Sequence, residues 1–524
     1  MIYERIEAVR KKYPDSQALC GVNILLCVSG SIAAYKALEL LSRLKKLDAN
    51  IAVVMSEEAK KFISPLSFEA LSHNQVLHSG TQSWVDSSPK YDNLASMYSN
   101  MPPVTNIPPY SINHIEYAKW ANIVIIAPAT ANIITKLAYG IADNLITQTL
   151  LAFNSTKTPL SQMLIPAKIL LAPAMNTKMF HSPQVQEALK KLQTYNYEII
   201  PPREALLACN TYGVGALAEV EEIIFRTLKS VFAQESTVQD FANEDCKIDF
   251  ENFWKDREVI ITGGGASAKI DSVRAISNHS SGKQAFALAK VAYTLGAKVT
   301  LISSKIEGFL PSEIECVNVI TNEDYANAIK SCLQKIDSIA NQTKNNAKSS
   351  KKNKLTNGAI NSTNNAHKKP VLFMAAALCD YKLESPKNYK IKKSTSPTLN
   401  VELVATSDIL ASINSDKIYK IGFKAESIDG DKTQENNIKV ALQNAKKMLL
   451  SVKEGGKDCD CVCLNLINEG ESSPFGADFN SFYLLDSMGL KDDKHIAFLA
   501  KESKLALSYK IFDFVKSSIA NKHK

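Results

Sequence analysis

Four side chains in the first half of this 524-residue chain could move protons or hold a polar substrate. His114 lies in INHIEYAKWA, Asn144 in IADNL, Asn176 in APAMN, and Cys209 beside glycines in ACNTYGVGALAE. An imidazole or a thiol can act as an acid or a base, and carboxamides can bind a carboxylate or an amide. Structural interpretations remain open: a structural histidine before a helix for His114, a turn after a strand for the stretch with Asn176, and a small buried residue for Cys209.

The second half contains a glycine-rich stretch that could bind a nucleotide. It reads ITGGGASAKIDSVRAISNHSSGKQAFALAK over 261–290, and glycines after a strand let phosphates approach the backbone closely. A nicotinamide dinucleotide site is the alternative. Against it, the consecutive Gly263, Gly264 and Gly265 lack the later, spaced glycine of that fingerprint. No acidic residue ends the next expected strand, 297–303, where a ribose-binding carboxylate would lie.

These residues must be positioned by strands and helices that alternate along the chain. Short apolar runs predict buried strands in the first half, over 23–29, 51–55, 122–129 and 168–174. A similar series starts at Arg257 and continues over 297–303, 370–377, 418–424 and 459–466. Helical spacing follows the first strand of each half, over 31–47 and 283–295. Because buried strands separated by helices form covered parallel sheets, we predict the α/β class, with two three-layer domains on flavodoxin-like or Rossmann-like parallel sheets.

Shifts in composition mark the boundaries of these domains. We predict a first domain over 1–228, a polar linker within 229–256 and a second domain over 257–524. Residues 79–110, rich in Ser, Pro, Asn and Tyr, are expected to form a long loop. Residues 341–369 are rich in Asn, Lys and Ser and cannot form a core, so we expect a disordered insertion there.

The insertion also accounts for the charge of the chain. The formal net charge is +8, but without the seven lysines of residues 341–370 the basic and acidic residues number 54 and 53. Since the insertion lacks interleaved aromatic residues, we expect no nucleic-acid partner. Deleting 343–367 should leave activity nearly intact, which assays of the shortened chain would check.

The composition excludes several other classes of protein. Hydrophobic residues are 45% and charged residues 22%, as in ordinary globular domains, which excludes a disordered chain, a fibre and a disulfide scaffold. No apolar run reaches about 18 residues and no signal peptide is apparent, so we expect a cytoplasmic protein without a membrane partner. The ten cysteines indicate thiols. Cys459, Cys461 and Cys463 fit one face of a buried strand better than a metal site, for which no ligands are assigned.

In this order, the first-half motifs resemble the flavin-dependent cysteine decarboxylase family, in particular its phosphopantothenoylcysteine decarboxylase branch. The resemblance covers residues 22–228. It implies FMN, which oxidises the cysteine thiol so that the carboxylate can leave, and then returns the electrons to the ene-thiol. It also implies roles for residues: His114 as a base or substrate-orienting group, Asn144, Met175 and Asn176 as substrate-binding residues, and Cys209 as the donor of the final proton.

The same resemblance implies an FMN site in the loops after the strands, in a segment such as SGSIAAYK (29–36), where small residues let a phosphate reach a helix start. Its residues would be Gly30, Ser31, Ile32, Ser56, Ala127, Pro128, Ala129 and Thr130.

The chain departs from the family in the cysteine loop. The family has Cys-Gly-Asp followed by Gly-x-Gly-Arg-Met. This chain has Cys209-Asn210-Thr211, followed by Gly-Val-Gly-Ala-Leu over 213–217. The cysteine and both glycines are kept, whereas the arginine is replaced by Ala216.

The SNHSSGK run and later motifs resemble the phosphopantothenate–cysteine ligase domain, over 257–520 outside the insertion. The later motifs are MAAALCDYK, KNYKIKK, IGFKAES and FGADFN. The bacterial family uses CTP: the carboxylate of 4′-phosphopantothenate attacks the α-phosphate, pyrophosphate leaves, and the amine of cysteine attacks the acyl-cytidylate. Mg²⁺ is expected with the triphosphate.

The ligase resemblance also implies roles for individual residues. Asn278 would stabilise the acyl-cytidylate, and Lys390 would contact the triphosphate and aid catalysis. Other nucleotide contacts would come from Met374, Ala375, Ala376, Asp380, Phe423 and Lys447. A second lysine, paired with Lys447, would be Lys453 or Lys457.

Together, the two resemblances imply a bifunctional enzyme of coenzyme A biosynthesis that uses 4′-phosphopantothenate, cysteine and CTP. They also imply a homo-oligomer, a dodecamer of trimeric decarboxylase and dimeric ligase domains. Two alternatives remain. A nicotinamide-dependent reductase would bind NAD(P)H at Gly263 to Gly265 and no flavin, whereas a non-catalytic flavoprotein scaffold would bind FMN without turnover.

Overall fold

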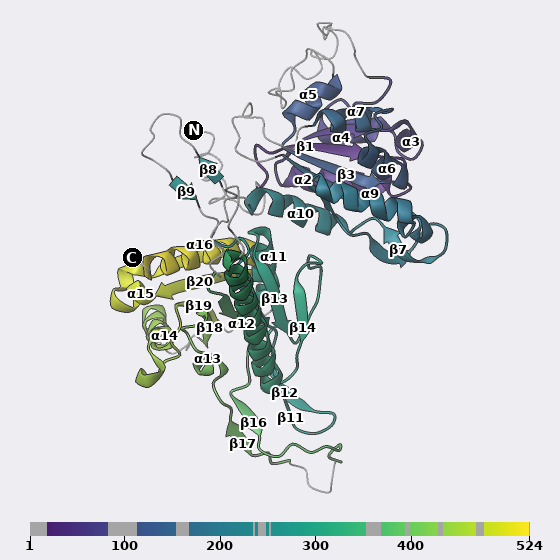
Figure 1. The fold of residues 1–524 in the computed structure, drawn as a ribbon. Helices are drawn as coiled ribbons and strands as arrows, with labels where there is room; N and C mark the ends of the chain where they lie inside the picture. Colours follow the sequence, from purple (N-terminus) through teal and green to yellow (C-terminus); the bar gives the residue numbers. More distant parts are fainter. Residues whose placement is uncertain are drawn as a thin grey trace. The chain divides into compact units, whose positions relative to one another are not determined.

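The chain divides into two compact units, Met1–Asn252 and Phe253–Lys524 (Figure 1). The computed structural model describes residues 18–81, 113–153, 167–233, 236–238, 248–250, 253–352, 368–392, 399–427, 433–467 and 476–522. Most of the loop predicted over 79–110 lies outside these residues.

The N-terminal unit is built on five parallel strands in the order β2-β1-β3-β4-β5. They are β1 (Asn23–Val28), β2 (Asn50–Met55), β3 (Ile123–Ala129), β4 (Lys168–Pro173) and β5 (Tyr197–Ile199). The first four occupy the predicted strand positions, which confirms the prediction of a flavodoxin-like parallel sheet. In this order the sheet grows first to one side of β1 and then, from β3, to the other.

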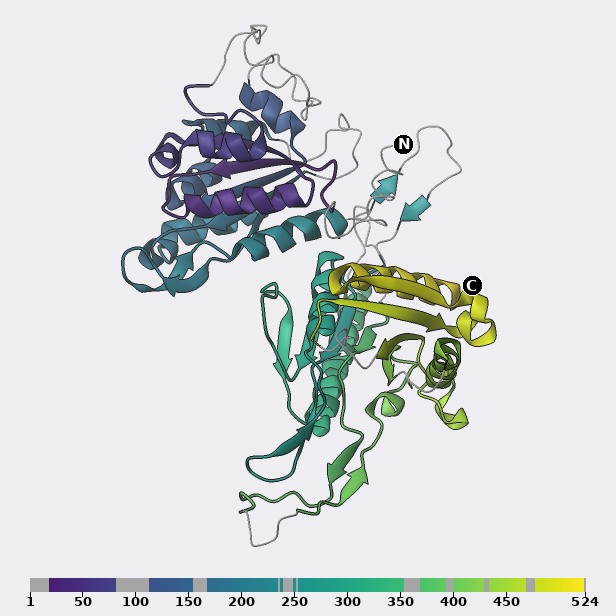
Figure 2. The same ribbon diagram turned by 180° about the vertical axis from the view of Figure 1, so that it is seen from behind.

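Helices cover both faces of this sheet because side chains alternate along β1 between two apolar layers (Figures 1 and 2). Ile24, Leu26 and Val28 share one layer with α2 (Ala34–Lys46), α4 (Pro65–Ser72) and α10 (Val220–Phe232). Leu25 and Cys27 share the other layer with α5 (Asn113–Trp120), α6 (Ala131–Tyr139), α7 (Leu145–Ala152) and α9 (Pro183–Thr194).

Short elements complete this unit. They are α3 (Glu57–Lys60), α8 (Thr177–Phe180), the hairpin of β6 (Arg203–Leu206) and β7 (Tyr212–Ala216), and the pair β8 (Ser236–Val238) and β9 (Ile248–Phe250). The composition of 230–256 predicts a connector without strands, whereas β8 and β9 pair antiparallel within it. Trp254 also differs from a linker residue, because it packs against Phe373 and Phe512 in the C-terminal unit.

The C-terminal unit is built on an eight-stranded sheet in the order β14-β13-β10-β15-β18-β19-β20-β21. Six strands are parallel: β10 (Glu258–Gly263), β13 (Lys298–Ser303), β14 (Glu315–Asn318), β15 (Val371–Met374), β18 (Tyr419–Ser427) and β19 (Cys461–Ile467). The last two, β20 (Phe479–Asp486) and β21 (Ala497–Ser503), run antiparallel. The sheet is therefore mixed, with an antiparallel edge added to a parallel body.

Helices again lie on both faces. On one face are α12 (Asn322–Lys352), α13 (Ile409–Ser412) and α14 (Gln434–Leu449), and on the other α11 (Lys283–Thr294) packs with α16 (Lys504–Lys522). The unit also contains β11 (Ser267–Lys269), β12 (Ala275–Ser277), β16 (Tyr381–Leu383), β17 (Leu403–Ala405), α15 (Ser487–Lys491), η2 (Val452–Glu454) and η3 (Asp493–His495). No helix in the described segments is long and apolar enough to span a membrane.

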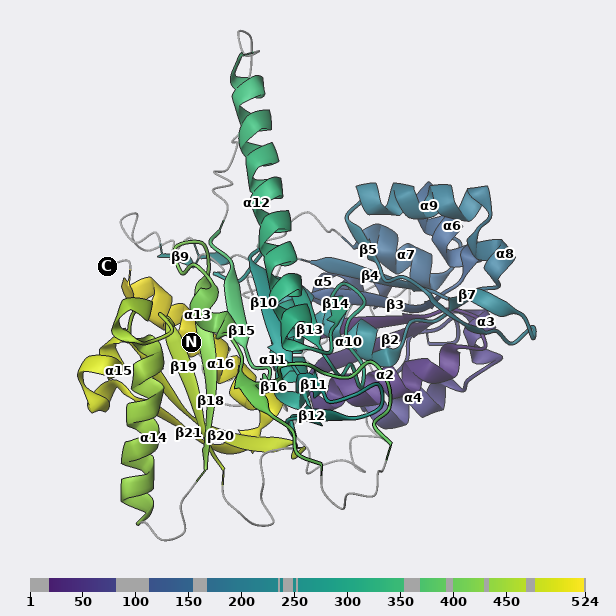
Figure 3. The same cartoon turned by 90° about the horizontal axis from the view of Figure 1, so that it is seen from below.

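Helix α12 continues into the segment predicted as a disordered insertion. It ends at Lys352, whereas the insertion was expected to begin at 341, and Figure 3 shows it extending well beyond the sheet. Residues 341–352 contain neither Gly nor Pro, so no residue among them breaks a helix. The structure therefore corrects the start of the insertion, and 353–367 lies outside the described residues.

Candidate active sites

A large cavity lies at the carboxyl ends of the strands of the N-terminal sheet. Its volume is about 830 Å³, within the range of ligand-binding sites. The loops after β1, β2, β3 and β4 line it, together with the β6–β7 hairpin. These loops meet near the boundary between β1 and β3, where the direction of sheet growth reverses. Open α/β sheets bind their ligands at this position.

Five of the predicted FMN-binding residues line the cavity, namely Gly30, Ser31, Ile32, Ser56 and Thr130. Only glycine fits at position 30 without a steric clash, because a Cβ atom there would lie 2.3 Å from Cβ of Glu58. The backbone of the loop after β1 can therefore approach α3 only where the side chain is absent.

Hydroxyl groups of this set begin the helices around the cavity. Ser56 accepts a hydrogen bond from the N–H of Ala59 at the start of α3, and Thr130 accepts one from the N–H of Ile133 at the start of α6. Helix starts with hydroxyl caps offer the N–H and O–H donors that suit a phosphate. The donor set therefore fits the phosphate group of FMN.

Ala127, Pro128 and Ala129 do not line the cavity, because they are buried at the end of β3. The carbonyl of Pro128 accepts a hydrogen bond from Ser29 Oγ at 2.7 Å, and Ser29 Oγ accepts one from the N–H of Thr130 at 3.1 Å. The structure thus places these three residues behind the cavity wall, where they support Thr130, and their predicted contact with FMN stays a prediction.

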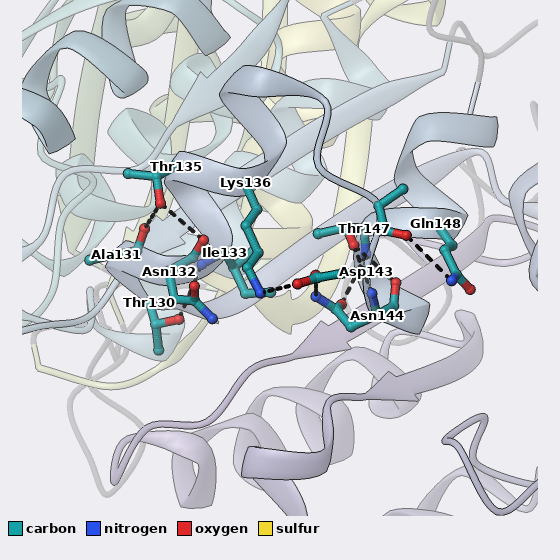
Figure 4. A network of polar contacts seen from close by, with 11 residues as sticks. Thr130, Ala131, Asn132, Ile133, Thr135, Lys136, Asp143, Asn144, Thr147 and Gln148 are labelled. Atoms are coloured by element: carbon teal, nitrogen blue, oxygen red, sulfur yellow. Dashed lines mark hydrogen bonds and ion pairs between the residues drawn. The ribbon is translucent and has the colours of Figure 1, made fainter.

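Asn144 lines the cavity and also begins α7. Its Oδ1 accepts a hydrogen bond from the N–H of Thr147 at 3.1 Å, as part of a capping box. Its Nδ2 donates to Asp143, whose carboxylate pairs with Lys136 at 2.7 Å (Figure 4). The carboxamide is therefore held with its N–H groups away from the helix.

Asn176 is arranged in the same way at the start of α8. Its Oδ1 accepts a hydrogen bond from the N–H of Lys178 at 2.8 Å, and its Nδ2 donates to Cys209 Sγ at 3.1 Å. Because a helix start occupies the oxygen, the amide presents donors toward the cavity, which suits a carboxylate or a thiolate. Met175, the residue before it, also lines the cavity as predicted.

Cys209 lies at the cavity wall, in the turn between β6 and β7. Thr211 Oγ1 lies 3.0 Å from its sulfur. Hydrogen bonds from Thr211 and then Asn176 hold the pKa of the Cys209 thiol below its usual value. The residue between them, Asn210, has φ +56°, a left-handed conformation that Asn tolerates where the family has Gly.

His114 does not line this cavity. It lies in the first turn of α5, which packs against α7, and burial lowers the pKa of its imidazole. Within the described part of one chain, the structure therefore brings Cys209, Asn144 and Asn176 together and leaves the predicted base apart from them.

Sequence reasoning missed two cations of the cavity wall, Lys36 and Arg203. Both pair with Glu219, at 3.6 and 3.1 Å respectively. Arg203 stands opposite Ala216 across the β6–β7 hairpin. Ala216 is the residue that replaces the arginine of the family pattern. A shift in the strand register between Arg203 and Glu204 produces this pairing, and no sequence signal reveals it.

A second cavity, of about 520 Å³, lies in the C-terminal unit, at the carboxyl ends of β15, β18 and β19 and the start of α11. The glycine run brings the backbone close around it. A Cβ atom at Gly263 would lie 2.4 Å from Cβ of Ala285, and one at Gly265 would lie 2.7 Å from the carbonyl oxygen of Asn278. The three-glycine pattern therefore serves close packing beside the cavity.

Most of the residues predicted for the nucleotide site line this cavity, namely Asn278, Met374, Ala375, Ala376, Asp380, Phe423 and Lys457. Asn278 Nδ2 donates to the carbonyl of Leu378 at 2.7 Å. Lys457 pairs with Asp408 at 2.9 Å. Of the two candidates for the second lysine, Lys457 lies at the cavity, whereas Lys453 is exposed in η2.

Lys390 and Lys447 do not line the cavity. Lys390 belongs to a loop held against the turn at 270–274, where the N–H of Ile391 donates to Asp271 at 3.1 Å. Lys447 lies in the last turn of α14, and its Nζ donates to Asn444 at 3.4 Å. Both lysines were predicted from their position in a motif alone. That position determines neither where the loop of Lys390 lies nor which face of α14 carries Lys447.

Two further lysines meet near the same cavity without having been predicted. Lys283, in the first turn of α11, pairs with Asp478 at 2.7 Å. Lys504 is largely buried at the start of α16, and burial, with Lys283 nearby, lowers the pKa of its ammonium group. Both lysines line the cavity, which gives it the positive charge that a triphosphate requires.

Cys461 and Cys463 in β19, and Cys459 just before this strand, are buried. Burial raises the pKa of Cys459 to about 12 and also raises the pKa of Cys461 and Cys463, so these thiols stay protonated at neutral pH. Among the described residues, no group of three or more His, Cys, Asp or Glu side chains could hold a metal ion.

Comparisons with known proteins match both units. The flavoprotein family model matches residues 12–232, and the model for the DNA/pantothenate metabolism flavoprotein C-terminal domain matches 254–354 and 358–519. The chain is 31% identical over 492 residues to the coenzyme A biosynthesis bifunctional protein CoaBC of Bacillus subtilis, covering 93% of this chain and 95% of the relative. It is 30% identical to that of Haemophilus influenzae over 476 residues, covering 90% and 93%.

Solved structures match each unit separately. A PPC decarboxylase mutant complexed with pantothenoylaminoethenethiol is 28% identical, with a TM-score of 0.32, covering 40% of this chain and 96% of that one. The C-terminal domain of a CoaBC protein is 22% identical, with a TM-score of 0.34, covering 52% and 100%. Because two family models match in sequence over nearly the whole chain, and bifunctional relatives at about 30% identity align over more than 90% of their own length, this protein belongs to the family of bifunctional coenzyme A biosynthesis proteins.

Proposed function

We propose that the N-terminal unit binds FMN and decarboxylates 4′-phosphopantothenoylcysteine to 4′-phosphopantetheine. The observation that carries this proposal is the convergence of Cys209, Asn144 and Asn176 in one cavity with five of the residues predicted to bind FMN. Membership of a flavoprotein family supports it. When bound, FMN supplies reversible removal of two electrons from the substrate thiol, which makes loss of the carboxylate possible.

The chain's own residues bind and protonate the substrate. The carboxamides of Asn144 and Asn176 bind the carboxylate and amide of the substrate through their N–H groups. Lys36 and Arg203 add positive charge for a ligand that carries phosphate and carboxylate groups. Cys209 donates the proton that completes reduction of the ene-thiol.

The C-terminal unit, we propose, joins 4′-phosphopantothenate to cysteine with CTP and Mg²⁺. Its cavity combines Asn278 with four lysines, Lys283, Lys424, Lys457 and Lys504. Cations and amide donors would stabilise charge on the triphosphate and on the pentavalent phosphorus formed when the carboxylate attacks the α-phosphate and pyrophosphate leaves. The Mg²⁺ ion would be held mainly by the phosphates, since protein sites for this ion often use substrate oxygens.

A homo-oligomer fits the position of His114. Because His114 lies outside the cavity of its own chain, its proposed role as a base requires another copy to complete the site. The free thiols of the described residues agree with the proposed cytoplasmic location. Sedimentation of the FMN-loaded protein, before and after His114→Ala, tests whether assembly persists while activity is lost.

The decarboxylase proposal is tested with FMN-loaded protein and 4′-phosphopantothenoylcysteine. Cys209→Ser is expected to release CO₂ but to accumulate the ene-thiol, which mass spectrometry separates from the saturated product. Cys316→Ser, which changes an exposed thiol of the other unit, is the control and should yield saturated product. Normal product from Cys209→Ser would contradict the assigned role.

A further inference from the structure

The hydroxyl group of Thr211 lies against the Cys209 thiol and has no part in the proposed reaction described above. Thr211 Oγ1 is 3.0 Å from Cys209 Sγ, and either group can donate the hydrogen bond. A hydroxyl can accept a hydrogen bond and can also donate one.

The turn that carries both residues fixes this contact. The N–H of Asn210 donates to the carbonyl of Leu207 at 2.9 Å, and the N–H of Leu207 donates to the carbonyl of Thr211 at 2.9 Å. Asn210 itself has φ +56°. The backbone thus closes a tight turn that holds the Thr211 side chain beside the sulfur.

The second partner of the sulfur limits what Cys209 can do alone. Asn176 presents an N–H donor to the sulfur, because its oxygen is bonded to the N–H of Lys178. Asn176 can therefore stabilise a thiolate but cannot accept the proton of a thiol. Of the two described partners, only Thr211 can do both. It is exposed on the loop, so its hydroxyl can also bond to water.

We propose that Thr211 is a positioning residue for the proton transfer by Cys209: it orients the S–H group and returns a proton to the sulfur after the transfer. The inference rests on the proposed role of Cys209. In this step the carbon that has lost CO₂ would take the proton of Cys209, and bound reduced FMN would supply the hydride needed at the carbon that bears sulfur. The product is the saturated thiol, with Cys209 as a thiolate. The thiolate takes the Thr211 proton as the hydroxyl takes one from water.

Thr211 and Asn176 also lower the pKa of the Cys209 thiol. The charged groups that line the same cavity are Lys36, Glu57, Glu58, Lys136, Asp143 and Arg203, and Lys178 lies on the neighbouring α8. None of these is changed by replacing Thr211. Removing the hydroxyl should therefore raise the pKa of Cys209, so that the alkaline limb of product formation moves to higher pH while the maximal rate falls.

The test compares Thr211→Val, which removes the hydroxyl, with Thr211→Ser, which keeps it. In FMN-loaded protein, Thr211→Val should release CO₂ normally but form saturated product about tenfold more slowly, so that the ene-thiol accumulates. Alkylation of Cys209 by iodoacetamide at pH 7, followed by peptide mass spectrometry, should be about tenfold slower because less thiolate is present. Thr211→Ser should restore both values.

Thr135→Val is the matched control, because Thr135 bonds to the carbonyl of Ala131 within α6 and does not line the cavity. It should behave as wild type. If Thr211→Val also behaves as wild type while Cys209→Ser accumulates the ene-thiol, the inference about Thr211 is overturned and the role of Cys209 stands. If Cys209→Ser forms saturated product, both fail. The alkylation readout needs no turnover, so it separates a shifted thiol pKa from a damaged active site.

Discussion

At the scale of single residues, a buried lysine organises the wall of the cavity in the C-terminal unit, which we propose binds CTP. Lys420, in β18, is fully buried, and its Nζ donates to the carbonyls of Lys457 and Ile413 at 2.7 and 3.0 Å. The carbonyl of Leu410 lies at 3.4 Å. These carbonyls belong to α13 and to the segment that carries Lys457, so one ammonium group joins two parts of the wall. Carbonyls at the end of a helix are favourable partners for a cation.

Replacing this cation should damage both stability and the nucleotide site. Lys420→Met leaves three carbonyl groups without their partner, so we expect the free energy of unfolding to fall by about 3 kcal/mol and the KM for CTP to rise about tenfold. Urea titration followed by pyrophosphate release measures both. Lys417→Met removes only an exposed ion pair with Asp337 and should change stability by about 0.5 kcal/mol or less. An unchanged urea midpoint for Lys420→Met would contradict this account.

Arg203 allows a second prediction at this scale. Arg203 lines the cavity proposed to bind the substrate, so Arg203→Met should raise the KM for 4′-phosphopantothenoylcysteine about tenfold and change kcat less. CO₂ release against substrate concentration measures this. Arg43→Met is the control, since Arg43 pairs with Glu221 between α2 and α10, away from the cavity. An equal change of KM in Arg203→Met and Arg43→Met would show that Arg203 acts only on the stability of the fold.

At the scale of elements, a carboxylate ties the loop of Lys390 to a neighbouring turn. Asp271 accepts hydrogen bonds from the N–H groups of Val273, Arg274 and Ile391 and pairs with the guanidinium of Arg274. Burial alone would raise the pKa of Asp271, but these donors outweigh it and hold the pKa well below its usual range. The ionised form is therefore the one that holds the loop.

The sign of this shift gives a prediction for pH. A carboxyl group with a depressed folded pKa contributes its full stabilisation above its unfolded pKa of about 3.9 and loses it only as pH falls through the folded value. Hydrogen exchange at the Ile391 amide, corrected for intrinsic rates, should therefore stay slow from pH 7 to about 4. Asp271→Asn should make it at least about tenfold faster at pH 7, whereas Asp513→Asn on α16 should not. Loss of protection near pH 6 in the wild type would contradict the assignment.

Elements were predictable where burial is strong and local. The apolar runs of β1, β3 and β4 fix both their position and their parallel pairing, because such runs must be covered on both faces. The extension of α12 to Lys352 was not predictable from composition, since Asn, Lys and Ser favour disorder without forbidding a helix. The register shift at Arg203 depends on the geometry of one hairpin, which residue types do not encode.

At the scale of the whole molecule, each unit contains its own cavity and its own set of polar residues. We therefore expect the two activities to be separable. Lys457→Met should abolish CTP-dependent pyrophosphate release but leave CO₂ release from added 4′-phosphopantothenoylcysteine within about twofold of wild type. Cys209→Ser should keep CTP-dependent pyrophosphate release but should not form the saturated product. A mixture of the two variants should convert 4′-phosphopantothenate to 4′-phosphopantetheine, and failure of the mixture would show that the intermediate must stay on one assembly.

The candidate sites show the same division between what motifs reveal and what only folding reveals. Asn144, Asn176 and Cys209 follow from their motifs because each lies directly after a strand or in a glycine turn at the active edge. Lys283 and Lys504 come from helices far apart in sequence, and only the packing of α11 on α16 places them together. His114 could be recognised by its motif but not placed, because one chain does not bring it to the cavity.

The two asparagines that begin α7 and α8 have a consequence for how this protein can change over evolutionary time. In each, the oxygen of the carboxamide accepts a hydrogen bond from a backbone N–H at the helix start, and the nitrogen lies at the cavity. An aspartate could start the helix equally well but would repel a carboxylate, and a lysine could attract the carboxylate but could not start the helix. Neither of these charged exchanges preserves both tasks. Exchanges that introduce a charge at these two positions are therefore disfavoured, which makes the two amides suitable anchors for an inhibitor.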